Sequence, residues 1–330
     1  MQIFSNIVTI IDVIYLIVLT MMLVASFAIQ TELAGVIRTL LIVMFSASAI
    51  LLPLSLVAEL WLLSTILAGC VAVLIFAYLP RLLPKQRERP TDKQVLSLLT
   101  FNLETAGEGE LGQITEIIQE KAPDIVGFQE LSHEGAAHFR QVFADRYPHQ
   151  KLYPQDNAHA GQGLLSRYPI AESEYYRWER APEKLGNIQA VLEVDGREMG
   201  LHVLHPFPPI SLSEGFNAEE HDKEVDELLQ RLATDDRPTL LMGDFNMTEH
   251  LESYRQITEH FTDAYKAVGE MGLGLTFPDG DRLTAPRLIR LDYVFYDDHF
   301  EGVLASTVER SGASDHRPLY VEVTFNQENA

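Results

Sequence analysis

Hydrophobic positions follow two different patterns along this chain. In the first eighty residues they form three nearly continuous apolar runs at 7–28, 33–57 and 60–79, interrupted only by Asp12 and Arg38. Each run reaches the roughly 20 residues that a helix needs to cross about 30 Å of hydrocarbon. A cleaved signal peptide does not account for three such runs, and no positive charge precedes the first. The pattern predicts a bundle of three transmembrane helices over residues 1–80.

Beyond residue 94 the apolar positions come in short runs and in helical spacings. Apolar residues at positions such as Leu111, Ile114 and Ile118 predict a helix, and further helices are predicted at 134–145 and 217–232. The predicted strands are 95–101, 125–128, 163–166, 188–194, 199–204, 239–242, 291–296, 303–308 and 319–324. Because strands and helices mix without strict alternation, the pattern indicates an α/β fold of layers with mixed sheets. Prolines and dense charge indicate a linker at 81–93, followed by one domain over 94–326.

Charge separates the two parts further. The chain has 25 Lys and Arg against 47 Asp and Glu, but residues 1–90 hold only five and four of them. The remainder therefore carries a formal net charge of about −23, which repels polyanions unless metals or local basic patches intervene. The only cysteine, Cys70, lies in an apolar run, so no disulfide framework is expected.

Flanking charge bears on the orientation in the membrane. Arg81, Lys85, Arg87 and Arg89 follow the third apolar run, although Glu88 and Asp92 lie among them. The positive-inside rule therefore slightly favours a cytoplasmic domain on a multi-pass protein of the cell membrane. The side of the membrane stays open at this point.

Polar residues recur where the predicted strands of the second part end. They are Asn102, Glu130, His205, Asp244 with Asn246, Asp292, and Asp315 with His316. Taken singly, each has an ordinary explanation as a turn residue or a helix cap. Taken together, carboxylates, amides and imidazoles at one rim are the groups that hydrolyse a phosphoester with a divalent metal.

The motifs that carry these residues resemble those of a known family. LTFNLE, DIVGFQE, GLLSRYP, LMGDFN, RLDYVFY and SDHRP occur in the order found in the endonuclease/exonuclease/phosphatase superfamily, also called the DNase I-like fold. The resemblance covers nearly all of residues 94–326, and the apolar runs make the chain similar to membrane-anchored bacterial members. It implies a four-layer α/β sandwich of two mixed β-sheets flanked by helices.

The resemblance also implies a metal site. Glu130 would hold Mg²⁺ or Mn²⁺, Asn102 would assist at the metal or the phosphate, and Asp315 would complete the shell of ligands. A few hard oxygen ligands suit Mg²⁺, which keeps several waters and takes further ligands from phosphate.

The same resemblance implies roles for the remaining residues. Asp244 would orient or deprotonate the attacking water, and Asn246 would donate a hydrogen bond to the phosphate. His316 would stabilise the transition state, while Asp292 would orient its ring and raise its pKa. His205 would be the general acid for the leaving group, with His202 as the competing candidate. His205 is favoured because it precedes Pro206 at a chain turn, whereas His202 lies within a strand.

The substrate is less constrained than the reaction. The acidic domain, a short tether to the membrane and an apolar segment at 206–210 favour a small or lipid-linked phosphoester, with the lipid bilayer as a partner. A nuclease is the first alternative, because folding could assemble a basic groove from Lys151, Arg167, Arg177, Arg180 and Lys184. An inactive module that binds lipid or a partner protein is the second. The oligomeric state is open.

The layout also resembles that of membrane-anchored family members linked to glycopeptide resistance, whose substrate is thought to be a lipid pyrophosphate. That resemblance would place the domain outside the cell, against the expectation from charge.

Overall fold

The computed structural model describes residues 2–29, 32–91, 93–104, 108–156, 158–178, 185–211, 215–216, 218–279, 287–312 and 314–326. The chain divides into two compact units. The first contains Met1–Leu83 with Thr248–Glu252, and the second contains Pro84–Met247 with Ser253–Ala330. Arg180 and Lys184 of the supposed basic groove, and Asn217 at the start of the predicted helix 217–232, lie outside the described residues.

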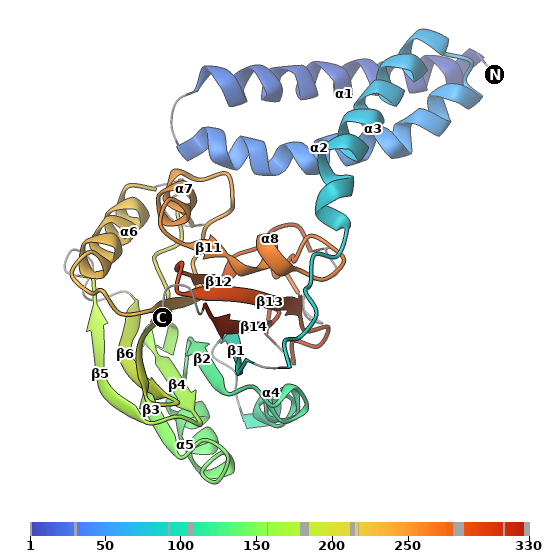
Figure 1. Ribbon diagram of the computed structural model, residues 1–330. Coiled ribbons are helices and arrows are strands. Elements are labelled where there is room, and N and C mark those ends of the chain that lie inside the picture. Colours follow the sequence, from blue (N-terminus) through green and yellow to red (C-terminus); the bar gives the residue numbers. More distant parts are fainter. Residues whose placement is uncertain are drawn as a thin grey trace. The chain divides into compact units, whose positions relative to one another are not determined.

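The first unit is built from α1 (Gln2–Ala28), α2 (Glu32–Val57) and α3 (Trp61–Leu82) (Figure 1). Within the described part of the chain, these three helices are long and apolar enough to cross a membrane. The prediction of three apolar N-terminal helices is therefore confirmed.

The two charges inside the apolar runs bond to neighbouring helices and not to each other. The Ser55 hydroxyl donates to the buried carboxylate of Asp12, and the Arg38 guanidinium donates to the Ser26 carbonyl at 2.9 Å. Such bonds partner polar groups that lipid cannot solvate, although the second carboxylate oxygen of Asp12 has no hydrogen-bond partner among the described residues.

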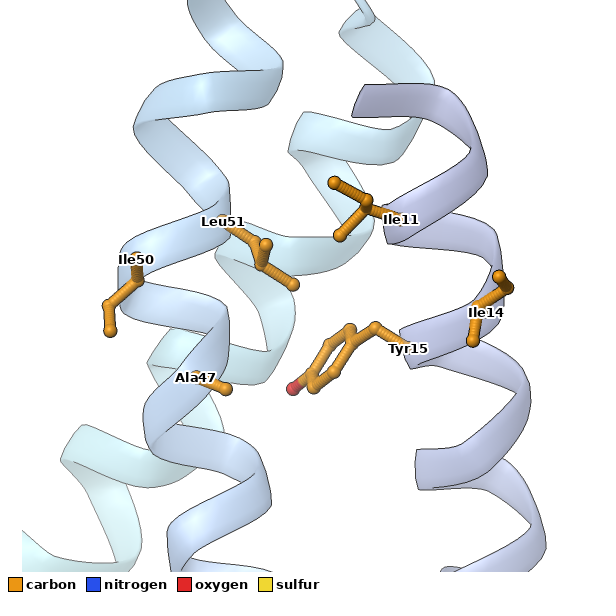
Figure 2. Close-up of a pocket in the computed structure, with 6 residues that line it drawn as sticks. All are labelled: Ile11, Ile14, Tyr15, Ala47, Ile50 and Leu51. Atoms are coloured by element: carbon orange, nitrogen blue, oxygen red, sulfur yellow. The ribbon is translucent and has the colours of Figure 1, made fainter. Parts of the chain in front are cut away.

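A groove of about 380 Å³ opens between α1 and α2 (Figure 2). Its lining is almost wholly apolar: Ile11, Ile14, Tyr15, Ala47, Ile50 and Leu51. The Tyr15 hydroxyl donates to the Met44 carbonyl at 2.8 Å, so the ring bridges the two helices while its polar atom is satisfied.

The second unit contains two six-stranded sheets within the described residues. In spatial order, the first sheet has β13 (Phe300–Thr307), β14 (Leu319–Phe325), β1 (Val95–Asn102), β2 (Ile125–Gln129), β4 (Gln162–Ser166) and β3 (His149–Tyr153). The second has β11 (Thr262–Asp263), β12 (Asp292–Tyr296), β10 (Thr239–Asp244), β7 (Arg197–Leu204), β6 (Gly186–Val194) and β5 (Ile170–Arg177). A small ribbon pairs β8 (Ile210–Ser211) with β9 (Gly215–Phe216).

The helices of this unit are α4 (Glu108–Lys121), α5 (His133–Val142), α6 (Ala218–Leu232), α7 (Glu252–Thr258) and α8 (Ala264–Val268), with a 3₁₀ turn η1 (Ala158–Ala160). The α5 helix begins at Ser132, whose hydroxyl accepts a hydrogen bond from the Gly135 amide, the usual cap of a helix N-terminus.

Apolar side chains of the two sheets meet in a shared core. Leu98 and Ile125 from the first sheet pack in the same cluster as Leu201 and Met242 from the second. A separate cluster fills the space between the outer face of the first sheet and helices α4 and α5. On the outer face of the second sheet, the α6 residue Arg231 lies 4.0 Å above the ring of Tyr176 in β5. The predicted sandwich of two mixed sheets flanked by helices is confirmed (Figure 1).

Parallel strand pairs place the polar strand ends together. The β1 and β2 strands run parallel in one sheet, and β7 and β10 run parallel in the other. Because parallel strands end at the same edge, each pair presents two carboxyl ends at one rim. Gly243 makes the second pair possible: its φ is +154°, and a Cβ there would lie 2.0 Å from the Leu204 carbonyl oxygen.

His202 lies in β7, where it is 1% exposed, and its burial lowers its pKa to about 4. The unfolded chain would bind this proton below about pH 6.5, whereas the folded chain would not until about pH 4. We therefore expect stability to fall by up to about 3 kcal/mol as the pH drops through this window. His202→Gln should remove that part of the acid sensitivity.

Urea unfolding of the full chain in detergent micelles, at several pH values, measures this effect. A Trp61→Phe background leaves the fully buried Trp178 as the only tryptophan reporter. An equal acid sensitivity with His202 and with Gln at this position would contradict the prediction.

Candidate active site

Asp244 lies at the centre of the polar rim, at the carboxyl end of β10. Its Oδ2 accepts a hydrogen bond from Asn102 Nδ2 at 2.9 Å, which joins the rims of the two sheets. Its Oδ1 accepts from the Asn246 amide at 2.9 Å. The Nε2 atoms of His205 and His316 lie 3.5 and 3.7 Å from Oδ2. The carboxylate is therefore held between two imidazoles.

This setting keeps Asp244 ionised. Burial by itself would raise its pKa, but the charge of His316 and the contacts with His205 and Asn102 outweigh burial and lower the pKa to about 2. An ionised carboxylate accepts hydrogen bonds only, so Asp244 can hold a water or a donor side chain.

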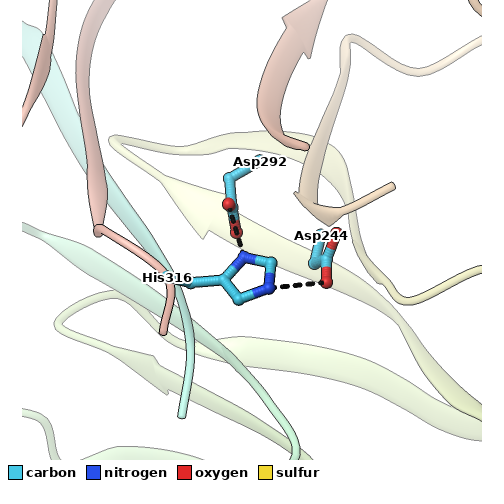
Figure 3. Close-up of side chains that lie close together, drawn as sticks. All are labelled: Asp244, Asp292 and His316. Carbon is cyan, nitrogen blue, oxygen red and sulfur yellow. Dashed lines mark hydrogen bonds and ion pairs between the residues drawn. The ribbon is translucent and has the colours of Figure 1, made fainter. Parts of the chain in front are cut away.

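His316 is held from its other side by Asp292. Its Nδ1 lies 2.8 Å from Asp292 Oδ2, while its Nε2 faces Asp244 (Figure 3). Asp292 opens β12 and pairs in register with Asp244 of β10. Burial disfavours the charged imidazolium, yet the two carboxylates raise the pKa of His316 to about 10. The ring is positively charged at neutral pH.

The loop that carries His316 is attached to the end of β1. Ser314 Oγ donates to the Asn102 carbonyl at 2.7 Å and accepts from the His316 amide at 3.0 Å. The Asp315 amide donates to Glu104 Oε2 at 2.9 Å. These bonds place Asp315 beside His316, with 3.8 Å between Asp315 Oδ1 and His316 Nε2.

Glu130 follows β2 with a φ of +57°, a left-handed conformation that is uncommon for residues other than glycine. Its Oε1 lies 3.3 Å from Asn102 Nδ2, and its Oε2 lies 2.6 Å from Nδ1 of His159. Burial would raise the pKa of Glu130, but the contacts with His159, His205 and Asn102 lower it. Backbone strain of this kind often occurs where a side chain is aimed at a functional site.

The acidic groups at this rim fit a divalent cation. Burial raises the pKa of Asp315 to about 6, and the negative charges of Glu104, Glu130 and Asp244 add to this effect. Carboxylates that repel one another at one edge form a hard oxygen donor set of the type that Mg²⁺ prefers. The amide of Asn102 turns its nitrogen toward Glu130 and Asp244, while its oxygen accepts from the Glu104 amide at 3.0 Å.

A neighbouring grouping within the described residues, Asp244, Asp292 and His316, has its donor atoms within 4.8 Å of one another. Both ring nitrogens of His316 face carboxylates of this grouping, so the imidazole can pass a proton between them.

His205 and Asn246 complete the rim. His205 is 3% exposed, and its Nε2 faces Asp244 and, at 3.9 Å, Glu130 Oε1. Asn246 Nδ2 donates to the Pro206 carbonyl at 3.0 Å, so this amide holds the neighbouring chain segment, and its hydrogen bond to phosphate stays a prediction. His202, three residues before His205, pairs in register with Gln189 and Leu241 inside the sheet.

The structure thus brings the polar strand-end residues of the sequence to one rim, whereas the competing candidate His202 lies inside the sheet: the rim residues are Asn102, Glu130, His205, Asp244, Asn246, Asp292, Asp315 and His316. It adds residues that the sequence reasoning did not select, namely Glu104, His159, Thr276 and Ser314. Thr276 Oγ1 accepts hydrogen bonds from the backbone amides of Leu291 and Asp292 at 3.1 and 3.3 Å. Glu104 and Ser314 stand inside the quoted motifs, whereas His159 comes from a turn with no recognisable pattern.

Comparisons with known proteins bear on the fold and on the family. Among solved structures, an endonuclease/exonuclease/phosphatase from Bacteroides vulgatus is 19% identical, with a TM-score of 0.59 over 71% of this chain and 100% of that chain. A mannosyl-6-phosphatase from Bacteroides thetaiotaomicron VPI-5482 is 19% identical, with a TM-score of 0.54 over 70% and 100%. Humanized D. rerio TDP2 is 16% identical, with a TM-score of 0.57 over 69% and 98%. A search of curated proteins gave no match.

At these identities the structural matches establish the fold. The sequence itself establishes the family, because residues 99–316, more than half of the chain, match the sequence model of the Endonuclease/Exonuclease/phosphatase family. This chain therefore belongs to the Endonuclease/Exonuclease/phosphatase family, whose members are metal-dependent phosphoesterases or nucleases.

Proposed function

We propose that this protein is a membrane-tethered phosphoester hydrolase that uses Mg²⁺ or Mn²⁺ and acts on a small or lipid-linked phosphoester. The observation that carries the proposal is the ionised Asp244 carboxylate held between the imidazoles of His205 and His316, beside the acidic group around Glu130. A base, an acid and a fixed positive charge are the parts that in-line attack of water requires, and here the two imidazole nitrogens lie 3.5 and 3.7 Å from the carboxylate.

The protein groups divide the reaction between them. Asp244 holds the attacking water and takes its proton as the new oxygen–phosphorus bond forms. The bond from phosphorus to the leaving oxygen breaks with its electron pair on that oxygen, which takes the proton from His205 Nε2. His316, kept charged by Asp292, donates to an oxygen of the phosphoryl group as negative charge builds up there. Asp244 then releases its proton to solvent and His205 takes one up from solvent, which restores both groups for the next turnover.

Glu130, Asn102 and Asp315 would hold the metal ion. When bound, a divalent cation neutralises phosphate charge and polarises the scissile bond. Asn102 would orient this group, because its amide nitrogen already contacts both Glu130 and Asp244.

Charge supports a small or lipid-linked substrate over nucleic acid. DNA binding normally draws much of its strength from free Lys and Arg that neutralise phosphates. Within the described residues, one cation of the supposed basic groove is instead paired with a carboxylate: Arg167 donates to Asp124 at 2.6 Å, which offsets its charge. The apolar helices α1 to α3 favour a substrate that is itself resident in the membrane. The mannosyl-6-phosphatase among the similar structures is also named for a small phosphoester.

The test uses the full chain in lipid vesicles. Phosphate release from a polyprenyl pyrophosphate and from a phospholipid head group is measured beside nicking of a supercoiled plasmid. We expect release from a lipid substrate that EDTA stops and Mg²⁺ restores, with no nicking at comparable enzyme levels. Asp244→Ala should abolish release. Asp195→Asn, in the exposed turn at the far end of β6 and β7, is the matched control and should not change it.

Catalytic nicking that disappears with Asp244→Ala would reject the substrate proposal in favour of a nuclease. No release and no nicking with any divalent metal would reject hydrolysis itself and favour a binding module.

A further inference from the structure

The segment that carries His205 leaves the sheet at the rim. The last residue of β7 in register with β10 is Leu204, opposite Gly243, and the last in register with β6 is Val203. His205, Pro206 and Phe207 follow without a ladder of backbone hydrogen bonds in the described part of the chain. Strand pairing therefore does not position the imidazole that faces Asp244.

Side chains from three separate elements hold this segment instead. Asn187 Oδ1 of β6 accepts from the His205 amide at 3.0 Å. Glu224 Oε2 of α6 accepts from the Phe207 amide at 2.5 Å. Asn246 Nδ2, after β10, donates to the carbonyl of Pro206 at 3.0 Å. We call these three contacts the bracket. Because Pro206 has no amide hydrogen, the bonds from His205 and Phe207 engage every backbone amide donor of the segment.

The groups of the bracket are costly to bury. Glu224 is 2% exposed and Asn187 is fully buried. A buried carboxylate is retained only where its hydrogen bonds offset the loss of hydration, and bonds to an ionised acceptor are about twice as strong as neutral ones. Since a backbone amide can only donate, the oxygen of Asn187 must face His205. Its Nδ2 is left without a partner among the described residues.

The two histidines of the site are thus held in different ways. The ring of His316 is fixed through Nδ1 by Asp292. The Nδ1 of His205 is buried without a partner, and among the residues that the structure describes no carboxylate orients the ring through that atom. The direction of His205 Nε2 then depends on the backbone that the bracket holds.

We infer that Asn187 and Glu224 are positioning residues, which act through the backbone of residues 205–207 to aim His205 Nε2 at the leaving oxygen. This inference rests on the proposed function. Neither residue touches the reacting atoms. Their removal should therefore impair protonation of the leaving group more than the binding of phosphate or metal.

The dependence of rate on the leaving group tests this role. A nitrophenolate leaves without protonation, whereas an alkoxide needs the proton, and general acid catalysis contributes roughly 10²–10⁴-fold to such a step. The full chain in vesicles is assayed on p-nitrophenyl phosphate and on glycerol phosphate. Glu224→Leu and Asn187→Leu should lower kcat/KM for glycerol phosphate about 10²-fold, and for p-nitrophenyl phosphate less than about 5-fold. The ratio of the two values does not depend on the fraction of enzyme that is folded.

Conservative and matched variants separate positioning from general damage. Glu224→Gln and Asn187→Asp keep an acceptor oxygen, so both should restore the ratio to within about threefold of the wild type. Glu227→Leu is the control, because Glu227 lies on the same helix and pairs with Arg231 at 3.5 Å. It should leave the ratio unchanged. In a His205→Ala background, Glu224→Leu should change the ratio no further, since coupled residues are not additive.

Three results would overturn the inference while hydrolysis stands: equal losses on the two substrates, no loss, or a Glu224→Gln variant as selective in its loss as Glu224→Leu. If the wild type hydrolyses neither these probes nor a lipid phosphoester, the proposed function is rejected and the inference falls with it.

Discussion

Replacing Asp244 with asparagine is expected to lower kcat about 10³-fold or more, within the range that positioned acid–base groups contribute. Asparagine keeps an oxygen that can accept the Asn246 amide, which Asp244 Oδ1 accepts at 2.9 Å. It lacks the negative charge that lies between His205 and His316 and cannot take a proton from water. The loss should therefore fall on kcat, with a smaller change in KM.

Steady-state phosphate release at saturating Mg²⁺ measures this prediction, with Asp195→Asn as the control that should retain full activity. Thermal unfolding followed by circular dichroism shows whether the variant is folded. A folded Asp244→Asn enzyme that keeps more than about a tenth of wild-type kcat would show that another group handles the proton of water.

Replacing Asp292 with asparagine should lower kcat about 10²-fold at neutral pH and make the enzyme sensitive to alkali. Asp292 Oδ2 lies 2.8 Å from His316 Nδ1 and is one of the two carboxylates that raise the pKa of this histidine to about 10. The charged imidazolium is the active form, so activity is lost as the pH rises through that pKa. Without Asp292 the pKa falls, and the alkaline limb of the kcat profile should move to lower pH.

A kcat profile from pH 6 to pH 10 measures the shift, and an unchanged alkaline limb would contradict it. Stability should follow the same linkage. Because the folded pKa is raised above the ordinary 6.5, the charged His316 contributes stability that is complete below about pH 6.5 and is lost as the pH rises toward 10. Urea unfolding should show this alkaline loss in the wild type and less of it in Asp292→Asn.

The sequence was informative wherever burial makes the pattern strong. Central strands such as β1 and β10 are buried along almost their whole length, and their apolar runs were expected. Two of the edge strands, β3 and β5, were missed. Their residues are mostly half-buried or exposed, so HQKLY and IAESEYYR lack the apolar alternation that marks a strand.

The candidate site could be anticipated only in part, for a related reason. Motif residues such as Asp244 and His316 follow apolar strands, and their recurrence points to one rim. Asn187 and Glu224 carry no such signal, because an asparagine in a strand and a glutamate in a polar helix are ordinary in sequence. Their importance comes from the fold, which brings them next to residues 205–207. Nothing in the sequence marks which distant residues become neighbours.

The hydrogen bond between Asn102 and Asp244 has a mechanical consequence. Its two ends belong to different sheets, whose faces in such sandwiches lie about 10 Å apart with apolar side chains between them. A larger or smaller side chain in this core, at Met242 for example, would change the distance that the hydrogen bond must span. The value of kcat would then depend on the distance between the two sheets. Substitutions deep in the core would change kcat as well as the free energy of unfolding.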